Sequence, residues 1–172
     1  LKSRKPRLPN VVFMLDVSGS MDKHSCNLLH LAYETCRKTS QVKVFVFSTD
    51  ISEVTREMKS TTMAEALTKI SGKVAHWSGG TKIGDCLTQL STEFSFVLNR
   101  YTTFVLMSDG WDTGEPEDVS RKLSVIKRTV KKLVWLNPLI GSGDYEQATR
   151  TLEASVPFVD VFASSRNINE LK

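Results

Sequence analysis

The sequence is poor in the features that mark membrane proteins, disulfide scaffolds and repetitive chains. Its 172 residues include only three cysteines, nine glycines and five prolines. No apolar run approaches the roughly 18 residues that a transmembrane helix needs. The composition also excludes a collagen-like or disordered chain. One globular domain with a sizeable core is what remains.

The cysteines offer neither a zinc pattern nor an even set for pairing. Their number is odd, and the spacing of Cys26, Cys36 and Cys86 matches no zinc-binding motif. Cys36 and Cys86 fall on apolar helical stripes, so we expect buried free thiols. Reduced thiols favour a cytoplasmic location.

Excess charge is confined to one end of the chain. The 23 basic and 19 acidic residues give a net charge of +4, but Lys2, Arg4, Lys5 and Arg7 supply that whole excess. Residues 1–9 also contain two prolines, which is typical of a solvated linker. Because the rest lacks a basic stripe, we expect no nucleic-acid partner. The short apolar runs likewise predict no membrane span. A first residue other than Met suggests a piece of a longer protein.

Short unbroken apolar runs alternate along the chain with amphipathic segments. We predict strands at 11–15, 44–47, 103–107 and 133–136, a weaker one at 159–162, and an antiparallel edge strand at 51–55. Apolar runs without polar alternation are typical of parallel strands covered on both faces. Helical stripes cover 28–36, 63–70, 83–97, 119–130 and 145–152, and we expect Gly72 to end the second.

Strands that alternate with helices require crossover connections. We therefore predict an α/β fold over residues 10–172, with a doubly wound, mostly parallel central sheet, helices on both faces and one short antiparallel edge strand. In such sheets, ligands bind beyond the carboxyl ends of the strands, near a topological switch point.

Polar residues cluster where that edge of the sheet is expected. Asp16, Ser18 and Ser20 follow the first strand, Thr81 precedes a helix, and Asp109 follows the strand that ends at Met107. Together these side chains offer a cation two carboxylates and three hydroxyls, without histidine or cysteine. An all-oxygen set suits Mg²⁺, and Mn²⁺ would fit similarly. If the hydroxyls bind directly and the aspartates act through water, the ion stays electrophilic and attracts a carboxylate from another molecule.

The same residues resemble a known family. Asp-x-Ser-x-Ser, a later Thr and a later Asp resemble the metal-ion-dependent adhesion site (MIDAS) of von Willebrand factor type A (VWA) domains. Longer matches resemble the bacterial CoxE-like branch. They are Asp16-Val-Ser-Gly-Ser-Met21, Trp77-Ser-Gly-Gly-Thr-Lys-Ile-Gly84, Ser108-Asp-Gly-Trp-Asp112 and Val134-Trp-Leu-Asn-Pro-Leu139.

The resemblance implies a binding module and no enzyme. It implies Ser18, Ser20 and Thr81 as direct ligands of Mg²⁺, with Asp16 and Asp109 acting through water or exchanging into direct contact. CoxE-like proteins are associated with MoxR-type AAA+ ATPases, and in one pathway they assist maturation of the metal centre of carbon monoxide dehydrogenase. The implied partner is a protein with an exposed Asp or Glu, either such an ATPase or its client.

Other interpretations remain beside this one. Asp16, Ser18 and Ser20 could form an N-cap cluster, Thr81 could cap a helix, and Asp109 could form a turn. A phosphatase-like hydrolase would use Asp16 as its nucleophile, although the position two residues on is Ser18 and Lys82 is the nearest cation. A metal-free scaffold of the same fold is the third alternative.

Overall fold

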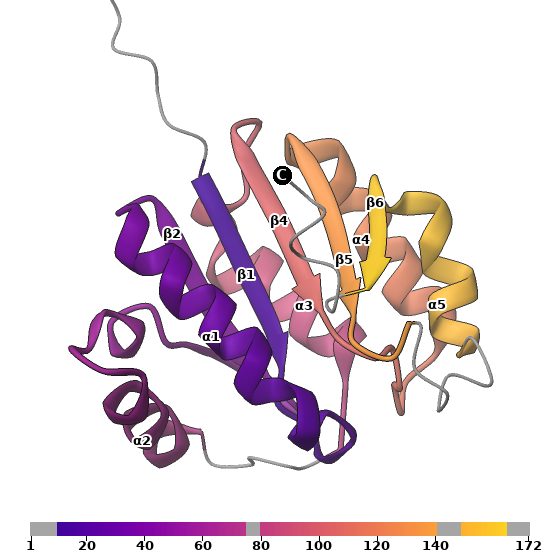
Figure 1. The fold of residues 1–172 in the computed structure, drawn as a ribbon. Coiled ribbons are helices and arrows are strands. Elements are labelled where there is room, and N and C mark those ends of the chain that lie inside the picture. Colours follow the sequence, from indigo (N-terminus) through magenta and orange to yellow (C-terminus); the bar gives the residue numbers. More distant parts are fainter. Residues whose placement is uncertain (1–9, 75–79, 141–148, 165–172) are drawn as a thin grey trace, which may run out of the picture.

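The protein is a three-layer structure with a sheet in the middle (Figure 1). The computed structural model describes residues 10–74, 80–140 and 149–164, apart from the side chains of residues 22–25. The strands are β1 (Asn10–Asp16), β2 (Val42–Phe47), β3 (Ile51–Glu53), β4 (Thr102–Met107), β5 (Lys132–Asn137) and β6 (Val161–Ser164). The α-helices are α1 (Asp22–Lys38), α2 (Met63–Lys73), α3 (Ile83–Glu93), α4 (Pro116–Thr129) and α5 (Arg150–Ser155). Short 3-10 turns cover Gly19–Met21, Glu57–Lys59, Ser95–Val97 and Val156–Phe158.

The strand order confirms the predicted fold class. The six strands run in the order β3-β2-β1-β4-β5-β6, and only β3 pairs in antiparallel fashion with its neighbour. After β1, the chain adds β2 and then β3 on one side of β1. It later adds β4, β5 and β6 on the other side of β1. The topological switch point therefore lies between β1 and β4, where their carboxyl ends meet.

Two hydrophobic cores lie on the two faces of the sheet. Alternate residues of β1 point to opposite faces, so Val12 and Met14 join one core and Phe13 and Leu15 join the other. The first core packs against α3, α4 and α5, and the second packs against α1 and α2. Both faces of the central strands are covered, which explains why their sequences lack polar alternation. None of the helices within the described ranges has the length and apolar character of a membrane span.

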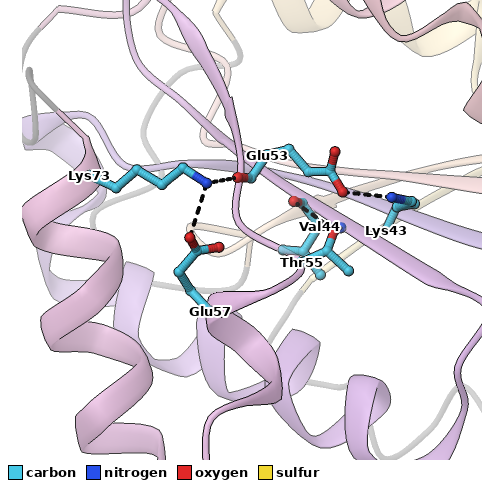
Figure 2. Close-up of polar contacts among 6 residues, drawn as sticks. All are labelled: Lys43, Val44, Glu53, Thr55, Glu57 and Lys73. Carbon is cyan, nitrogen blue, oxygen red and sulfur yellow. Dashed lines mark hydrogen bonds and ion pairs between the residues drawn. The ribbon is translucent and has the colours of Figure 1, made fainter.

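The antiparallel edge strand is shorter than predicted. Its last paired residue is Glu53, because the Thr55 side chain takes over the next position: its hydroxyl accepts a hydrogen bond from the Val44 N–H at 3.0 Å. Figure 2 shows how this edge is closed. Lys73 Nζ donates to the Glu53 carbonyl at 2.6 Å and to Glu57 at 3.0 Å, while Lys43 pairs with the Glu53 carboxylate at 2.7 Å. Lysines at an exposed strand discourage pairing with another chain.

Other boundaries also differ from the sequence-based prediction. The last strand begins at Val161, because Pro157 lies in a 3-10 turn and Asp160 bonds to the backbone of Leu133. Gly72 lies inside α2, which ends at Lys73. The helix predicted over 83–97 ends at Glu93 and continues as a separate 3-10 turn. The predicted linker 1–9 and the first half of the helix predicted over 145–152 fall outside the described residues, and α5, which covers most of the second half, ends at Ser155.

Candidate metal centre

Asp16 forms the buried centre of the polar cluster at the carboxyl edge of the sheet. It is the last residue of β1 and has no exposed surface. Its Oδ1 accepts a hydrogen bond from the Ser18 N–H at 2.9 Å, and its Oδ2 accepts one from the Ser108 hydroxyl at 2.7 Å. No lysine or arginine of the described part of the chain forms an ion pair with it. Within the described ranges, the carboxylate is therefore held by neutral donors.

Burial dominates the electrostatics of Asp16. It raises the pKa of the carboxyl to about 6 from an ordinary 3.8. The hydrogen bonds from Ser18 and Ser108 act in the opposite direction, and the nearby charge of Asp109 adds to the increase. The charged form is thus destabilised by its surroundings, and a cation placed beside it would relieve that cost.

The two predicted serine ligands lie next to each other in the turn that follows β1. Ser18 is buried, Ser20 is exposed, and their Oγ atoms are 3.2 Å apart. Helix α1 starts after Met21, which occupies its N-cap position and whose side chain makes no capping hydrogen bond. Neither serine is the N-cap residue of this helix, so the N-cap interpretation is wrong for α1. Their Oγ atoms are close enough together to contact the same ligand.

Thr81 reaches the same edge from the start of α3. It is buried, and the next residue donates from its N–H to the Ser48 carbonyl, at the end of β2, at 2.9 Å. The N-cap position of α3 is Lys82, not Thr81, and the first turn is instead capped by Asp112, whose Oδ1 accepts from the Ile83 N–H at 3.0 Å. Among the described residues, the Thr81 hydroxyl has no hydrogen-bond partner. The helix-cap interpretation of Thr81 is therefore wrong.

Asp109 follows β4 and is also buried. Its Oδ1 accepts a hydrogen bond from the Trp111 N–H at 3.0 Å, so the predicted turn is real. This hydrogen bond uses one carboxylate oxygen of Asp109. The preceding residue, Ser108, bonds directly to Asp16. The structure thus joins Asp16, Ser18 and Ser20 by hydrogen bonds to residues 108–115 between β4 and α4, here called the Asp109 loop, and brings Thr81 to the same edge.

Supporting residues that the sequence did not single out hold the Asp109 loop. The Ser108 hydroxyl binds Asp16, and its carbonyl accepts from Trp135 Nε1 at 2.9 Å. Asn137, fully buried at the end of β5, donates from Nδ2 to the Asp109 carbonyl at 3.2 Å. All three residues lie in motifs quoted above for the resemblance. The sequence could have indicated them by their polar side-chain atoms, which lie in or next to apolar strands.

The remaining polar and aromatic candidates have separate roles. Asp112 caps α3, and burial raises its pKa. Asp85 is exposed and pairs with Lys82 at 3.8 Å. The Trp111 side chain is 61% exposed, which excludes packing beneath the loops. His30 is exposed and stacks on Tyr33. Trp77 and His76 lie outside the described residues, and Cys26, Cys36 and Cys86 form no disulfide.

A comparison with known protein families identifies the family of this chain. A family model described as "VWA domain containing CoxE-like protein" matches residues 1–171. The chain belongs to this family. A comparison with curated protein sequences finds no match. The CoxE-like resemblance drawn from the sequence is confirmed for the family, over essentially the whole chain.

Solved structures show that this VWA domain shares its fold with distant proteins. An aerotolerance-related membrane protein from Bacteroides fragilis has a TM-score of 0.57 at 14% identity, with 95% of this chain and 94% of that chain covered. BatB from Bacteroides thetaiotaomicron has a TM-score of 0.56 at 14% identity, with the same shares covered. Proximal thread matrix protein 1 from the mussel byssus, in a structure with a zinc-occupied MIDAS motif, has a TM-score of 0.56 at 17% identity. That comparison covers 95% of this chain and 46% of that one.

The backbone at Gly110 generates a stability prediction for the VWA domain. Gly110 has a φ of +82°, and a Cβ there would lie 2.5 Å from Leu152 Cγ. Gly110→Ala should therefore cost about 3 kcal/mol or more in urea unfolding, since left-handed strain and overlap add. Gly72→Ala is the control: nothing lies within 4 Å of its Cβ position inside α2, so we expect a gain of about 0.5–1 kcal/mol. Equal stability of Gly110→Ala and wild type would contradict the geometry.

The buried Asp16 generates a pH prediction for the metal-free domain. The pKa of the Asp16 carboxyl is raised in the folded protein. As the pH rises from about 4 to 6, this carboxyl therefore loses its proton in the unfolded chain before it does so in the folded one. The stability contributed by protonated Asp16 is present below this window and falls across it by on the order of 3 kcal/mol. Asp16→Asn should remove that fall, and at pH 7 with EDTA it should be more stable than wild type.

Urea unfolding in EDTA between pH 4 and 8 measures the difference between the two proteins. Asp160→Asn is a control of opposite sign, because the hydrogen bond from Lys127 lowers the pKa of Asp160. That variant should lose stability at neutral pH. The account of Asp16 is wrong if Asp16→Asn is the less stable protein at pH 7 without metal.

Proposed function

We propose that this domain is a protein-binding module that holds Mg²⁺ or Mn²⁺ with Asp16, Ser18, Ser20, Thr81 and Asp109. The observation that carries the proposal is the buried Asp16 carboxylate, which has no ion-pair partner among the described residues and lies beside a pair of hydroxyls. A buried charge without a counter-charge is costly, and such charges are normally paired or coordinate metals.

The donor chemistry fits a hard divalent cation. All the proposed ligands offer oxygen, which Mg²⁺ and Mn²⁺ prefer. No group of three or more histidine, cysteine or acidic side chains in the described ranges could hold a metal ion. A site built on histidine and thiolate therefore does not fit this part of the chain, and hydroxyl oxygens have to contribute. The mussel protein supports the idea that a VWA domain can carry a divalent ion at this motif.

The hydrogen bonds of the aspartates favour an acidic partner. Both oxygens of Asp16 already accept bonds, from the Ser18 N–H and the Ser108 hydroxyl, and Oδ1 of Asp109 accepts from the Trp111 N–H. These bonds reduce how much negative charge the carboxylates donate, and the hydroxyl ligands are neutral. A metal held here would supply Lewis acidity toward an external carboxylate. We infer that an Asp or Glu of a partner protein completes the site.

Trp111 supports a protein as the partner. Its side chain is 61% exposed although its backbone N–H is bonded to Asp109. Tryptophan is enriched at the energetic centres of protein interfaces. A partner whose acidic residue reaches the metal would cover this indole and bury its apolar surface.

Family membership supports the finer part of the proposal. We infer an adaptor role for a MoxR-type AAA+ ATPase, without catalytic activity, in maturation of a client protein or its metal centre. The unpaired Cys26, Cys36 and Cys86 support the cytoplasmic location that goes with such a role. Against the hydrolase alternative, Lys82, the nearest candidate cation, is exposed and pairs with Asp85.

Metal titration tests the binding site against the metal-free alternative. Calorimetry with MgCl2 and MnCl2 should detect one bound ion in the wild type. Ser18→Ala, Thr81→Val and Asp109→Asn should each weaken binding by at least about tenfold. Ser91→Ala removes a hydroxyl whose one bond among the described residues goes to the Leu87 carbonyl of its own helix, so it should bind like wild type. Absence of binding by wild type, or equal binding by Ser18→Ala, would contradict the proposal.

Peptide selection tests the partner chemistry without knowledge of the partner. A random peptide library is bound to the immobilised domain in Mg²⁺ and eluted with EDTA. The selected peptides should share an Asp or Glu whose replacement by Asn or Gln abolishes binding. Peptides that lack an acidic residue, or that stay bound in EDTA, would rule out metal-bridged docking. A purified MoxR-type ATPase, with Asp109→Asn as the control, is the protein partner to test next.

A further inference from the structure

A chain of hydrogen bonds leads from the candidate metal centre to the N-terminus of α5. The Ser108 hydroxyl donates to Asp16 at 2.7 Å and accepts from the Gly110 N–H at 3.0 Å. The Gly110 carbonyl accepts from the Thr149 hydroxyl at 2.8 Å. That hydroxyl in turn accepts from the Leu152 N–H at 3.2 Å, and so caps α5. One hydroxyl therefore serves both the helix and the Asp109 loop.

A steric contact reinforces the same connection. Gly110 is left-handed, and Leu152 of α5 lies against it so closely that a Cβ at Gly110 would be 2.5 Å from Leu152 Cγ. Leu152 is buried in the core cluster of α3 and α4. The Gly110 backbone thus lies between Ser108, which bonds to Asp16, and the buried side chain of Leu152.

The connection borders an open cleft. A cleft of about 360 Å³ is lined by Trp111, Glu115 and Pro116 on one side and by Thr149, Arg150 and Thr151 on the other. Trp111 belongs to the Asp109 loop, and Thr149–Thr151 form the start of α5. A partner seated in this cleft would therefore contact both the Asp109 loop and the start of α5.

We propose that the N-terminus of α5 sets the cation affinity of the site, with Thr149 and Leu152 as positioning residues for the Asp109 loop. This inference rests on the proposed function, because it assumes that the loop contributes to a metal site. Thr149 touches no ligand itself; it fixes the Gly110 carbonyl, and through it the Ser108 hydroxyl on Asp16. Coupling of this kind is reciprocal, so metal binding should also order the first turn of α5.

The chain provides a matched control for Thr149. Thr62 caps α2 with the same geometry, since its hydroxyl accepts from the Glu65 N–H at 3.2 Å. Thr62 is exposed and makes no bond to the Asp109 loop. Thr149→Val and Thr62→Val each lose one helix cap, but only Thr149→Val also loses the bond to Gly110. Thr149→Ser keeps both bonds and is the conservative rescue.

Calorimetric titration with MgCl2 separates the outcomes. Thr149→Val should bind about three- to tenfold more weakly than wild type, the range expected for one lost hydrogen bond, while Thr149→Ser and Thr62→Val bind like wild type. If wild type binds and Ser18→Ala does not, but Thr149→Val binds like wild type, the inference is overturned and the metal site stands. Equal weakening by Thr62→Val also overturns it. If wild type does not bind, the proposed function fails and the inference fails with it.

Hydrogen exchange on the wild-type domain gives a test that needs no variant. Adding Mg²⁺ should slow exchange of the Gly110 and Leu152 amides together, while the Glu65 amide of the α2 cap stays unchanged. Protection of Gly110 without any change at Leu152 would show that α5 is not coupled to the site.

Discussion

The burial of one uncompensated carboxylate organises this edge of the molecule. Asp16 ends the central strand β1 at the switch point of the sheet, with no surface exposed, and the donors that its oxygens have among the described residues are neutral. The donors come from its own turn and from the loop after β4, so satisfying Asp16 fixes two loops at once. The Asp109 loop is held further by Trp135, Asn137 and Thr149. These bonds hold the Asp16 carboxylate in place, yet its pKa is still raised. Both properties suit a group that binds a cation.

Much of the fold follows from local sequence patterns. The central strands are continuous apolar runs because both faces of the sheet are covered, and alternation with amphipathic segments requires crossovers. Details decided by single side chains were not predictable. Thr55 replaces a strand residue with a side-chain bond, and Gly72 is tolerated inside α2 because the helix continues for only one more residue.

The sequence was enough to predict the residues of the candidate site, but not the hydrogen bonds that hold them. Asp16, Ser18, Ser20, Thr81 and Asp109 follow strand ends or precede a helix, and parallel strands bring such positions to one edge. Sequence alone could not show that Asp112, and not Thr81, caps α3. Nor could it show that Thr149, far along the chain, bonds to Gly110. These contacts depend on how loops pack, and loop packing leaves no periodic signal.

The proposed function depends on whether these side chains hold a hard divalent ion. Anomalous diffraction from crystals of the domain grown with MnCl2 is the measurement to make, because the anomalous scattering of manganese near its absorption edge locates the ion. We expect one anomalous peak in contact with the hydroxyls of Ser18 and Ser20 and adjacent to Asp16, Thr81 and Asp109. Manganese found only elsewhere, or no peak while Asp16 keeps its bonds to Ser18 and Ser108, would contradict it.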